Sequence, residues 1–211
     1  MTDDTQFVAI DFETTGTVEG YPTEPWQIGM VFMRGGRVEG QYRFQSLLHV
    51  GDRPFNPYAP GRHTSVRGEL LVAPTLHDLW GQLEPWLGGR PLVAHSTATE
   101  RKMLGEAFPL HPFGPWIDTL DLVRVAYPGL ENHKLEDVVP RLGLQERVME
   151  IAPDLGPHDA FYDAVACAVL LEHLLGLEGW QGLALASLTN AKSRALLRIQ
   201  AARNDASLHR K

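Results

Sequence analysis

The chain has 211 residues, 44% of them hydrophobic, and a formal net charge of −7 at pH 7. A chain of this length can bury one proper hydrophobic core, so we expect one domain. The negative charge argues against a protein that coats DNA or RNA broadly, although it leaves open a site that grips one strand end. The single cysteine, Cys167, excludes an internal disulfide and a cysteine-based zinc site.

Targeting and membrane signals are missing from this sequence. The first residues, MTDDTQF, lack the basic and apolar regions of a signal peptide, and no later run approaches the ~20 uninterrupted apolar residues of a membrane span. We therefore expect a cytoplasmic protein without a membrane partner.

The first third of the chain reads as strands followed by a loop. Residues 6–10 and 25–33 are rich in β-branched and large apolar residues without helical spacing, and both are predicted strands. The adjacent glycines Gly35 and Gly36 predict a tight turn into a third strand, giving an antiparallel meander. Proline and glycine dominate residues 49–74, which we expect to form a long loop that approaches the substrate.

The rest of the chain alternates helix and strand. Helices are predicted over 73–87, 96–108, 133–144 with an interruption near Pro140, and 158–177; short strands are predicted at 92–95 and at the start of 116–127, before another helix. This order predicts an α/β fold: a mixed sheet of three antiparallel strands, then parallel strands, with helices on both faces.

The C-terminal segment differs from the rest of the chain in its charge. Residues 190–211 carry six basic residues against the single acidic residue Asp205, and an amphipathic helix is predicted from about 187 to 203. We expect a main domain over 1–180 and a basic C-terminal helix or tail over 181–211 that packs on the same domain.

Two carboxylates end the first predicted strand. Asp11 and Glu13 are two residues apart, so their side chains project from the same face. Clustered carboxylates suit a hard divalent cation such as Mg²⁺ or Mn²⁺, although an acidic turn at a strand end is also common for other reasons.

A histidine and an aspartate mark the start of the long helix in PHDAFYDA, residues 157–164. Pro157 and Asp159 are typical helix-start residues, so His158 lies just before the helix and Asp163 about one turn inside it. A five-residue step within a helix would separate them by roughly 140°, but a residue before the cap can fold back over the first turn. The alternative is a surface histidine and a solvated acid favoured by the helix dipole.

The motifs DFETTG, LVAHSTATERKML and HDAFYDA occur in this order and resemble the three motifs of the DEDDh exonucleases, relatives of the proofreading epsilon subunit of bacterial replicative polymerases. The resemblance covers roughly residues 6–175, includes the segment ENHKLEDVVPRLGL, and implies a ribonuclease H-like fold. It also implies a two-metal 3′–5′ exonuclease that releases nucleoside 5′-monophosphates from single-stranded DNA or RNA, with a role in proofreading or repair.

The resemblance assigns roles to individual residues. Two Mg²⁺ or Mn²⁺ ions would be held by four carboxylates, and His158 would be the general base that deprotonates the attacking water. The metal ligands would be Asp11, Glu13, Glu100 and Asp163, and the residues around the terminal nucleotide would be Thr14, Thr15, Gly16, His95 and Ser96.

The middle motif departs from the family pattern, in which His-Asn is followed by Asp. Here His95 and Ser96 are followed by Glu100, which keeps the charge but adds a methylene. The segment TATE also matches a capping box, in which Glu100 would bond the backbone of Thr97. For His95 the alternative is a structural histidine, and for Asp118 and Asp121 we favour helix capping.

Three functions remain open at this stage. The first is an active exonuclease acting on a nucleic acid with a free 3′ end. The second is a module that keeps the same fold but has weakened catalysis, and that binds nucleic acid or a polymerase. Glu100 would then be the first sign that the catalytic site has been lost. The third is a proofreading partner whose C-terminal helix docks on a DNA polymerase subunit or on a second copy of the chain.

Overall fold

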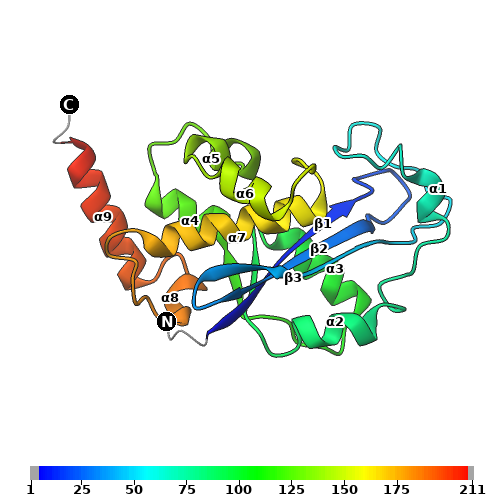
Figure 1. Ribbon diagram of the computed structural model, residues 1–211, viewed down its shortest axis with the longest axis horizontal. Helices are drawn as coiled ribbons and strands as arrows, with labels where there is room; N and C mark the ends of the chain where they lie inside the picture. The colour runs from blue at the N-terminus through cyan, green and yellow to red at the C-terminus, as the bar shows by residue number, and fades with distance from the viewer. Residues whose placement is uncertain (1–4, 209–211) are drawn as a thin grey trace.

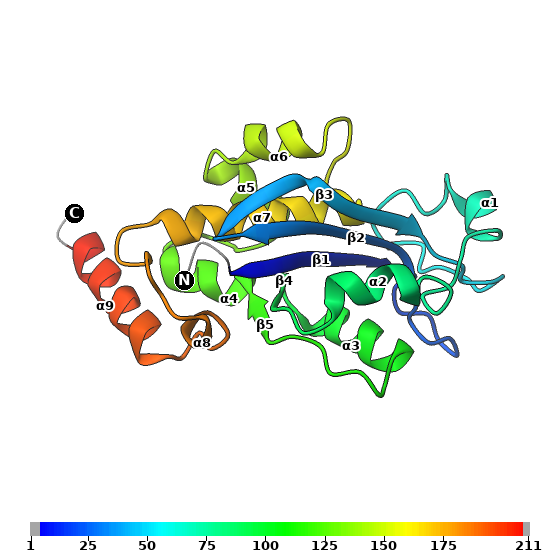
Figure 2. The same cartoon turned by 60° about the horizontal axis from the view of Figure 1, so that its bottom comes forward.

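The computed structural model describes residues 5–208, in which a five-stranded sheet lies between two layers of helices (Figures 1 and 2). The strand order is β3-β2-β1-β4-β5. The strands are β1 (Gln6–Thr14), β2 (Pro25–Arg34), β3 (Arg37–Leu47), β4 (Leu92–Ala94) and β5 (Trp116–Asp118). The first three pair antiparallel, while β4 pairs parallel with β1 and β5 parallel with β4, which confirms the predicted mixed sheet.

Helices cover both faces of this sheet, as predicted. In Figure 2, α5, α6 and α7 lie on one side of β1–β3, and α2 and α3 lie on the other. The helices are α1 (Arg67–Leu70), α2 (Trp80–Leu87), α3 (Ala98–Ala107), α4 (Thr119–Ala126), α5 (Leu135–Arg141), α6 (Gln145–Ile151), α7 (Ala160–Gly176), α8 (Leu185–Leu188) and α9 (Arg194–Leu208).

The central strand β1 is buried on both faces. Phe7 and Ala9 belong to the hydrophobic cluster that includes α7, whereas Val8 and Ile10 belong to the cluster that includes α2 and α3. This explains the continuous apolar run in the sequence. The strand extends past the predicted end at residue 10, because its pairing with β2 continues through Glu13 opposite Gln27.

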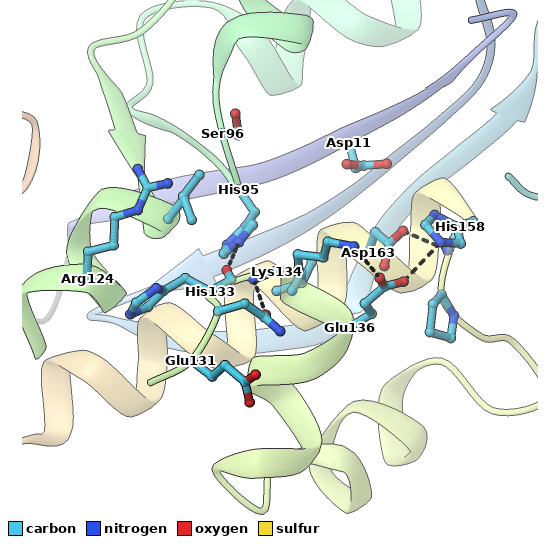
Figure 3. Close-up of a pocket in the computed structure, with 14 residues that line it drawn as sticks. Asp11, His95, Ser96, Arg124, Glu131, His133, Lys134, Glu136, His158 and Asp163 are labelled. Carbon is cyan, nitrogen blue, oxygen red and sulfur yellow. Dashed lines mark hydrogen bonds and ion pairs between the residues drawn. The ribbon is translucent and has the colours of Figure 1, made fainter. Parts of the chain in front are cut away.

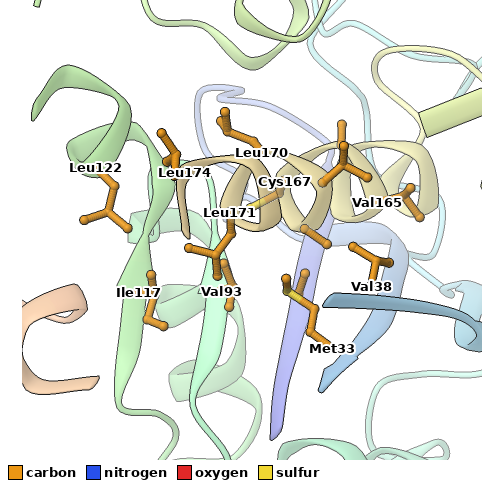
Figure 4. Packing of buried hydrophobic residues seen from close by; sticks show 14 of the residues in the cluster. Met33, Val38, Val93, Ile117, Leu122, Val165, Cys167, Leu170, Leu171 and Leu174 are labelled. Carbon is orange, nitrogen blue, oxygen red and sulfur yellow. The ribbon is translucent and has the colours of Figure 1, made fainter. Parts of the chain in front are cut away.

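The helix α7 fills the larger of the two core layers. Along its length, apolar side chains face β1–β3, β4 and α4, and most of the helix is buried. Figure 4 shows Val165, Cys167 and Leu171 packed over Val93 and Met33. Burial on all sides fixes the position of the first turn of α7 relative to the sheet.

The start of α7 crosses β2 at Gly29, which lies opposite Asp11 in the β1–β2 register. A Cβ at Gly29 would lie 2.3 Å from the carbonyl carbon of Ala160 and 2.3 Å from the nitrogen of Phe161. Real Cβ atoms do not approach backbone this closely. Glycine at this position therefore allows the first turn of α7 to lie directly against the sheet.

Several predicted helix boundaries are wrong. The helix predicted over 73–87 begins only at Trp80, because the Asp78 carboxylate accepts bonds from the backbone N–H and hydroxyl of Thr75 and forms a turn instead. Pro140 stands in the last turn of α5, as expected for an interruption there, but the separate helix α6 had not been predicted.

The C-terminal helix predicted over 187–203 is two helices, α8 and α9. Between them the side chain of Asn190 accepts a bond from the N–H of Lys192, a local turn that competes with helix. Leu196 of α9 is fully buried in the same cluster as α4 and α7. Arg210 and Lys211 of the predicted basic tail lie outside the described residues.

Across residues 5–208, none of the helices is both long enough and apolar enough to cross a membrane.

Replacing Gly29 by alanine should separate α7 from β2. We expect Gly29→Ala to lower the free energy of unfolding by about 1–3 kcal/mol, because the added methyl group overpacks a backbone contact. Chemical denaturation measures this change, and hydrogen exchange should become faster at the amides of the first turn of α7.

The matched control is Gly105→Ala in α3, where a Cβ would have no neighbour within 4 Å. Because alanine loses less backbone entropy than glycine on folding, this variant should be more stable by about 0.5–1 kcal/mol. Equal effects of the two substitutions would contradict the close approach at Gly29.

Candidate active site

The carboxylates of β1 lie on the α7 side of the sheet. Asp11 and Glu13 follow Phe7 and Ala9 in the alternation of the strand, and those two residues pack in the α7 cluster. Glu13 is 8% exposed. The strand therefore delivers both side chains to the region where α7 begins, as their spacing predicts.

Asp159 anchors the start of α7 to the sheet. Its carboxylate caps the helix by accepting bonds from the N–H groups of Phe161 and Tyr162, at 3.1 and 3.4 Å. The side-chain amide of Gln27, in β2, donates to Asp159 Oδ2 at 2.9 Å. The predicted cap is confirmed, and the same carboxylate ties the helix to β2.

His158 folds back over the first turn of α7. Its backbone has a φ of 66°, in the left-handed region, and its N–H donates to Asp163 Oδ2 at 2.8 Å. Left-handed backbone is uncommon for residues other than glycine, and here it turns the chain just before the cap. The histidine and the aspartate therefore meet although the helical spacing alone would separate them.

These residues form a cluster with the geometry of a cation site. Ligand atoms of Glu13, His158 and Asp163 all lie within 4.8 Å of one another. Asp11 is not part of this triad, but it lines the same cavity of about 680 Å³ as His158 and Asp163 (Figure 3). The cavity runs from this cluster past His95, Ser96 and the segment that begins α5.

Glu100, in the first turn of α3, lies close enough to Asp11 for its charge to raise the pKa of that carboxyl group, although neither Glu100 nor Glu13 lines the cavity. The Glu100 side chain is 4% exposed, and its Oε2 atom has no hydrogen-bond partner among the described residues. A buried carboxylate oxygen without a donor is costly in a folded protein. A cation near this oxygen would supply the missing partner.

Glu100 does not form the capping box that the sequence suggested. The N–H of Thr97 donates to Asp118 Oδ2 at 2.9 Å, and Thr97 makes no side-chain cap. Asp118 also accepts from the N–H groups of Ser96 and Leu120, so it caps α3 and α4 together. Capping by Asp118 is confirmed, whereas Asp121 instead pairs with Arg124 on the surface, at 3.4 Å.

Burial is the main cause that raises the pKa values of all four carboxyl groups, and neighbouring negative charges add to it. Burial and then the charge of Glu100 raise the pKa of Asp11 well above its usual range. Burial and the charge of Asp163 raise the pKa of Glu13 to about 8. Burial raises the pKa of Glu100 to about 7 and that of Asp163 to about 6, the latter opposed by the N–H of His158. The site holds more negative charge than its own surroundings stabilise.

His95 borders the cavity as a structurally bonded histidine. Its Nε2 lies 2.8 Å from the carbonyl oxygen of His133 and its Nδ1 lies 3.0 Å from the Thr119 hydroxyl. Burial lowers the pKa of His95, which favours the neutral ring. The neighbouring Ser96 is exposed, has a φ of 71°, and also lines the cavity.

The residues Thr14, Thr15 and Gly16 do not line this cavity. The Thr15 side chain is 1% exposed, and its hydroxyl accepts a bond from the N–H of Glu24 at 3.1 Å. Its carbonyl accepts from the N–H of Asn56, at 2.8 Å. Thr15 thus joins the end of β1 to the long loop, while the hydroxyl of Thr14 remains close to Gly16.

The long loop between β3 and α2 reaches the edge of the site. A Cβ at Gly61 would lie 2.8 Å from the carbonyl oxygen of His158, and Arg62 Nε lies 3.4 Å from Asp159 Oδ2. His63 is buried and stacked on Phe55, with 4.8 Å between ring centroids, and the guanidinium carbon of Arg67 lies 4.4 Å from the centroid of the same Phe55 ring. Arg62 therefore approaches the site, whereas His63 and Arg67 hold the loop together.

Glu136 is a site residue that the sequence did not single out. Its Oε2 atom lies 3.1 Å from His158 Nε2, and its Oε1 atom lies 3.6 Å from Lys134 Nζ (Figure 3). Glu136 and Lys134 both belong to the segment ENHKLEDV, which resembles the family, but the sequence assigns neither residue a role. The contact with His158 arises only when α5 packs beside the start of α7.

Comparison with known proteins places the chain among nucleases. The family model for exonucleases of the RNase_T group matches residues 8–171. The chain is 28% identical over 179 residues to DNA polymerase III PolC-type from Bacillus cereus, covering 80% of this chain and 11% of that protein. It is 28% identical over 184 residues to exodeoxyribonuclease 10 from Escherichia coli K12, covering 87% of this chain and 75% of that protein. The chain thus spans about a tenth of the PolC-type relative.

Solved structures share the fold. Exonuclease X in complex with 5′-overhanging duplex DNA superposes with a TM-score of 0.64 at 24% identity, covering 87% of this chain and 99% of that one. The nuclease domain of 3′hExo, a DEDDh family member bound to rAMP, gives 0.61 at 17% identity over 82% of this chain and 92% of that one. S. pombe Pop2p in its Mg²⁺- and Mn²⁺-bound form gives 0.60 at 14% identity over 87% and 88%.

The family match and the fold agree with the order of the three sequence motifs and with the proximity of the acidic residues of the first and third motifs, Asp11, Glu13 and Asp163. The chain therefore belongs to the DEDDh exonuclease family and has its ribonuclease H-like fold.

Proposed function

We propose that this protein is a divalent-metal-dependent 3′–5′ exonuclease that releases nucleoside 5′-monophosphates from the 3′ end of single-stranded DNA or RNA. The observation that carries the proposal is the cluster of Glu13, His158 and Asp163 beside Asp11, which shares a cavity with His158 and Asp163. Glu100, from α3, lies close enough to Asp11 for its charge to raise the pKa of that carboxyl group. The cavity is open enough to admit the end of a strand, and the site is partly lined by the cationic side chains Arg124 and Lys134.

The residues present fit two divalent cations. The donor set is made of carboxylate oxygens, which Mg²⁺ and Mn²⁺ prefer, and one of those oxygens, Oε2 of Glu100, is buried without a donor. Asp11, Glu13, Glu100 and Asp163 would hold the ions. Once bound, the ions would stabilise the entering and leaving oxygens of an in-line displacement at phosphorus.

His158 is the proposed general base. It lies beside Asp163 and lines the cavity, so a water molecule held there can pass a proton to its ring. The resulting imidazolium would lie next to the Glu136 carboxylate, 3.1 Å from Nε2. Glu136 would in turn be held by Lys134, at 3.6 Å. His95, with both ring nitrogens bonded, would shape the pocket rather than transfer protons.

The names of the relatives support nucleic acid as the substrate class. The name of exodeoxyribonuclease 10 and the DNA in the exonuclease X complex favour DNA, whereas the bound rAMP of 3′hExo favours a site that accepts ribose. We therefore keep both sugars in the proposal. Thr14, Thr15 and Gly16 would act at the terminal nucleotide through the backbone that they and the long loop form together.

Association and organisation are also proposals. The PolC-type relative is a polymerase, which supports a role in proofreading or repair beside a DNA polymerase subunit. Docking through the C-terminal segment 181–211, or self-association through it, is an alternative to packing on the exonuclease domain 1–180 alone. The cytoplasmic location stays a prediction from the sequence.

Removing the proposed base should abolish most of the activity. We expect His158→Ala to lower kcat by about 10²–10⁴-fold, because a positioned general base contributes that much to proton transfer. The measurement follows 5′-labelled single-stranded DNA and RNA with Mg²⁺ or Mn²⁺, reading the ladder of shortened products.

The control is His111→Ala, at an exposed histidine outside the cavity, which should keep wild-type rates. If the wild-type protein produced no ladder with either metal on either nucleic acid, the proposed function would be wrong.

The raised pKa values predict a pH-dependent stability without metal. Glu13 has a pKa of about 8 in the folded protein and an ordinary value of 4.5 in the unfolded chain. Between these values the folded state binds more protons, so stability should fall as the pH rises from about 4.5 to 8. We expect the metal-free wild type to have a lower Tm at pH 8 than at pH 6, and Glu13→Gln to reduce that difference by a few degrees.

Thermal unfolding in a chelating buffer and again with Mn²⁺ measures both effects. The metal should raise the Tm of the wild type at pH 8, because it binds only the folded site, and should raise the Tm of Glu13→Gln less. Exposed Glu146→Gln in α6 is the matched control and should behave as the wild type. A wild-type Tm that Mn²⁺ leaves unchanged would argue against the metal site.

Glu100 separates an active enzyme from a decayed one. We expect Glu100→Gln to lower kcat roughly 10–100-fold, because it removes a charge near the metals while keeping the volume. Glu100→Asp should stay within severalfold of the wild type, because the glutamate already reaches the site. A large gain of activity in Glu100→Asp from a nearly inactive wild type would instead support the weakened binding module.

A further inference from the structure

A second cavity lies away from the candidate active site and combines arginine with aromatic side chains. Its volume is about 380 Å³, and it opens between the start of β1, the far ends of β2 and β3, and the end of α2. The lining residues are Gln6, Phe32, Arg34, Tyr42, Pro85, Trp86 and Arg90, and we call this cavity the arginine groove.

The arginine groove is on the opposite side of the sheet from the catalytic carboxylates. Phe32 and Trp86 pack against the cluster on the α2 and α3 face, whereas Asp11 belongs to the α7 face. Gln6 and Asp11 are also five residues apart along β1, which corresponds to about 17 Å of strand. The groove is therefore separate from the catalytic cavity, and the catalytic site does not account for its residues.

The charge of the groove is unusual for this chain. The protein carries a net charge of −7, yet no acidic residue lines the groove, and two arginines do. Glu39 lies 3.6 Å from Arg34 Nε and balances part of that charge from outside the lining. The groove thus offers cationic groups in a mostly acidic protein, which favours an anionic ligand.

One of the two guanidinium groups is held in place before any ligand binds. Arg90 Nε donates to Gln6 Oε1 at 3.3 Å, and Arg90 Nη1 donates to the carbonyl oxygen of Pro85. Both Arg90 and Arg34 place their guanidinium carbons 5.9 Å from the centroid of the Phe32 ring. Because Arg90 is already ordered, less conformational entropy would be lost on contact with an anion.

Aromatic side chains form the rest of the groove. Tyr42 is 52% exposed and meets the ring of Phe32 edge-on, with 6.1 Å between centroids. Trp86 lines the groove from α2 and is tilted against Phe44 at 6.4 Å. Half-exposed aromatic rings beside arginine match the chemistry that holds unpaired bases and their phosphates.

We propose that the arginine groove binds unpaired nucleotides of the same single strand whose 3′ end enters the catalytic cavity. Arg34 and Arg90 would contact phosphates, and Tyr42 and Trp86 would stack on bases. This inference rests on the proposed exonuclease function, since that function brings single strands to the protein. An acidic peptide would satisfy the arginines but would leave the aromatic rings without a matching group.

The proposal predicts that the groove contributes to the binding of long strands only. A trinucleotide in the catalytic cavity is too short to reach around the sheet, whereas a strand of roughly 20 nucleotides is long enough to occupy both places. We expect Arg34→Gln/Arg90→Gln to weaken the binding of the long strand about tenfold and to reduce the salt dependence of its affinity, because each lost phosphate contact lowers the slope by about 0.7. Its hydrolysis of a trinucleotide should match the wild type.

Binding is measured by fluorescence anisotropy of labelled oligothymidylate and oligouridylate in an Asp11→Asn background, which prevents hydrolysis during the titration. The charge-matched control is Arg147→Gln/Arg198→Gln, at exposed positions of α6 and α9 outside the groove. Tyr42→Ala, which removes a half-exposed ring and no charge, should also weaken the long strand severalfold.

The outcomes separate this inference from the function it rests on. The inference is overturned if Arg34→Gln/Arg90→Gln changes the affinity for the long strand no more than Arg147→Gln/Arg198→Gln does, even if the enzyme is active. The inference is also overturned if an oligoglutamate peptide displaces the labelled strand at a lower concentration than the unlabelled strand does, because the groove would then be a peptide site. If Arg34→Gln/Arg90→Gln fails to fold by circular dichroism, the single variant Arg34→Gln decides, since among the described residues the Arg34 guanidinium forms an ion pair with Glu39 and is 47% exposed.

Discussion

The site depends on the close contact between the first turn of α7 and β2. Gly29 lets the backbone of Ala160 approach the sheet, and Gln27 fixes the same turn through Asp159 and the N–H of Ala160. Asp11, which pairs with Gly29 in the β1–β2 register, is thereby brought under the start of the helix. The apolar packing along the rest of α7 supports this contact, because a helix buried on all sides cannot tilt away from the strand.

The contact also creates the electrostatic problem of the fold. It gathers Asp11, Glu13 and Asp163 in a buried space where burial and neighbouring negative charges raise their pKa values. For Asp163, the N–H and the charge of His158 oppose this rise. Selection for stability alone would favour apolar residues in place of such a cluster. Retention of the charges is understandable when a divalent cation completes the site.

Local sequence signals were enough for the parts of the fold that depend on neighbouring residues. Alternation placed Asp11 and Glu13 on one face, and Gly35 and Gly36 marked the hairpin, where both have positive φ. The mixed character of the sheet, three antiparallel strands and then parallel strands, followed from the order of the elements along the chain. Helix ends were less predictable, because side chains such as Asp78 and Asn190 formed turns inside segments with helical spacing.

The site was predictable as a set of motifs but not as a geometry. The meeting of His158 with Asp163 requires a left-handed backbone at His158, which no residue type in the segment signals. The capping box at Thr97 looked plausible because its true partner, Asp118, is 21 residues away in the sequence. Glu136 and Gly29 were missed for the same reason: their roles arise from contacts between distant elements.

The placement of charge explains how an acidic chain can serve a polyanion. The carboxylates of the proposed metal site are concentrated where β1 and α7 meet, so cations at the rim are needed to attract a strand toward them. Arg124 and Lys134 line the catalytic cavity, and Arg62 lies beside Asp159. These few cations are too sparse to coat a duplex, and they suit the strand end of the proposed function. A net charge of −7 therefore restricts the extent of the nucleic-acid surface rather than its existence.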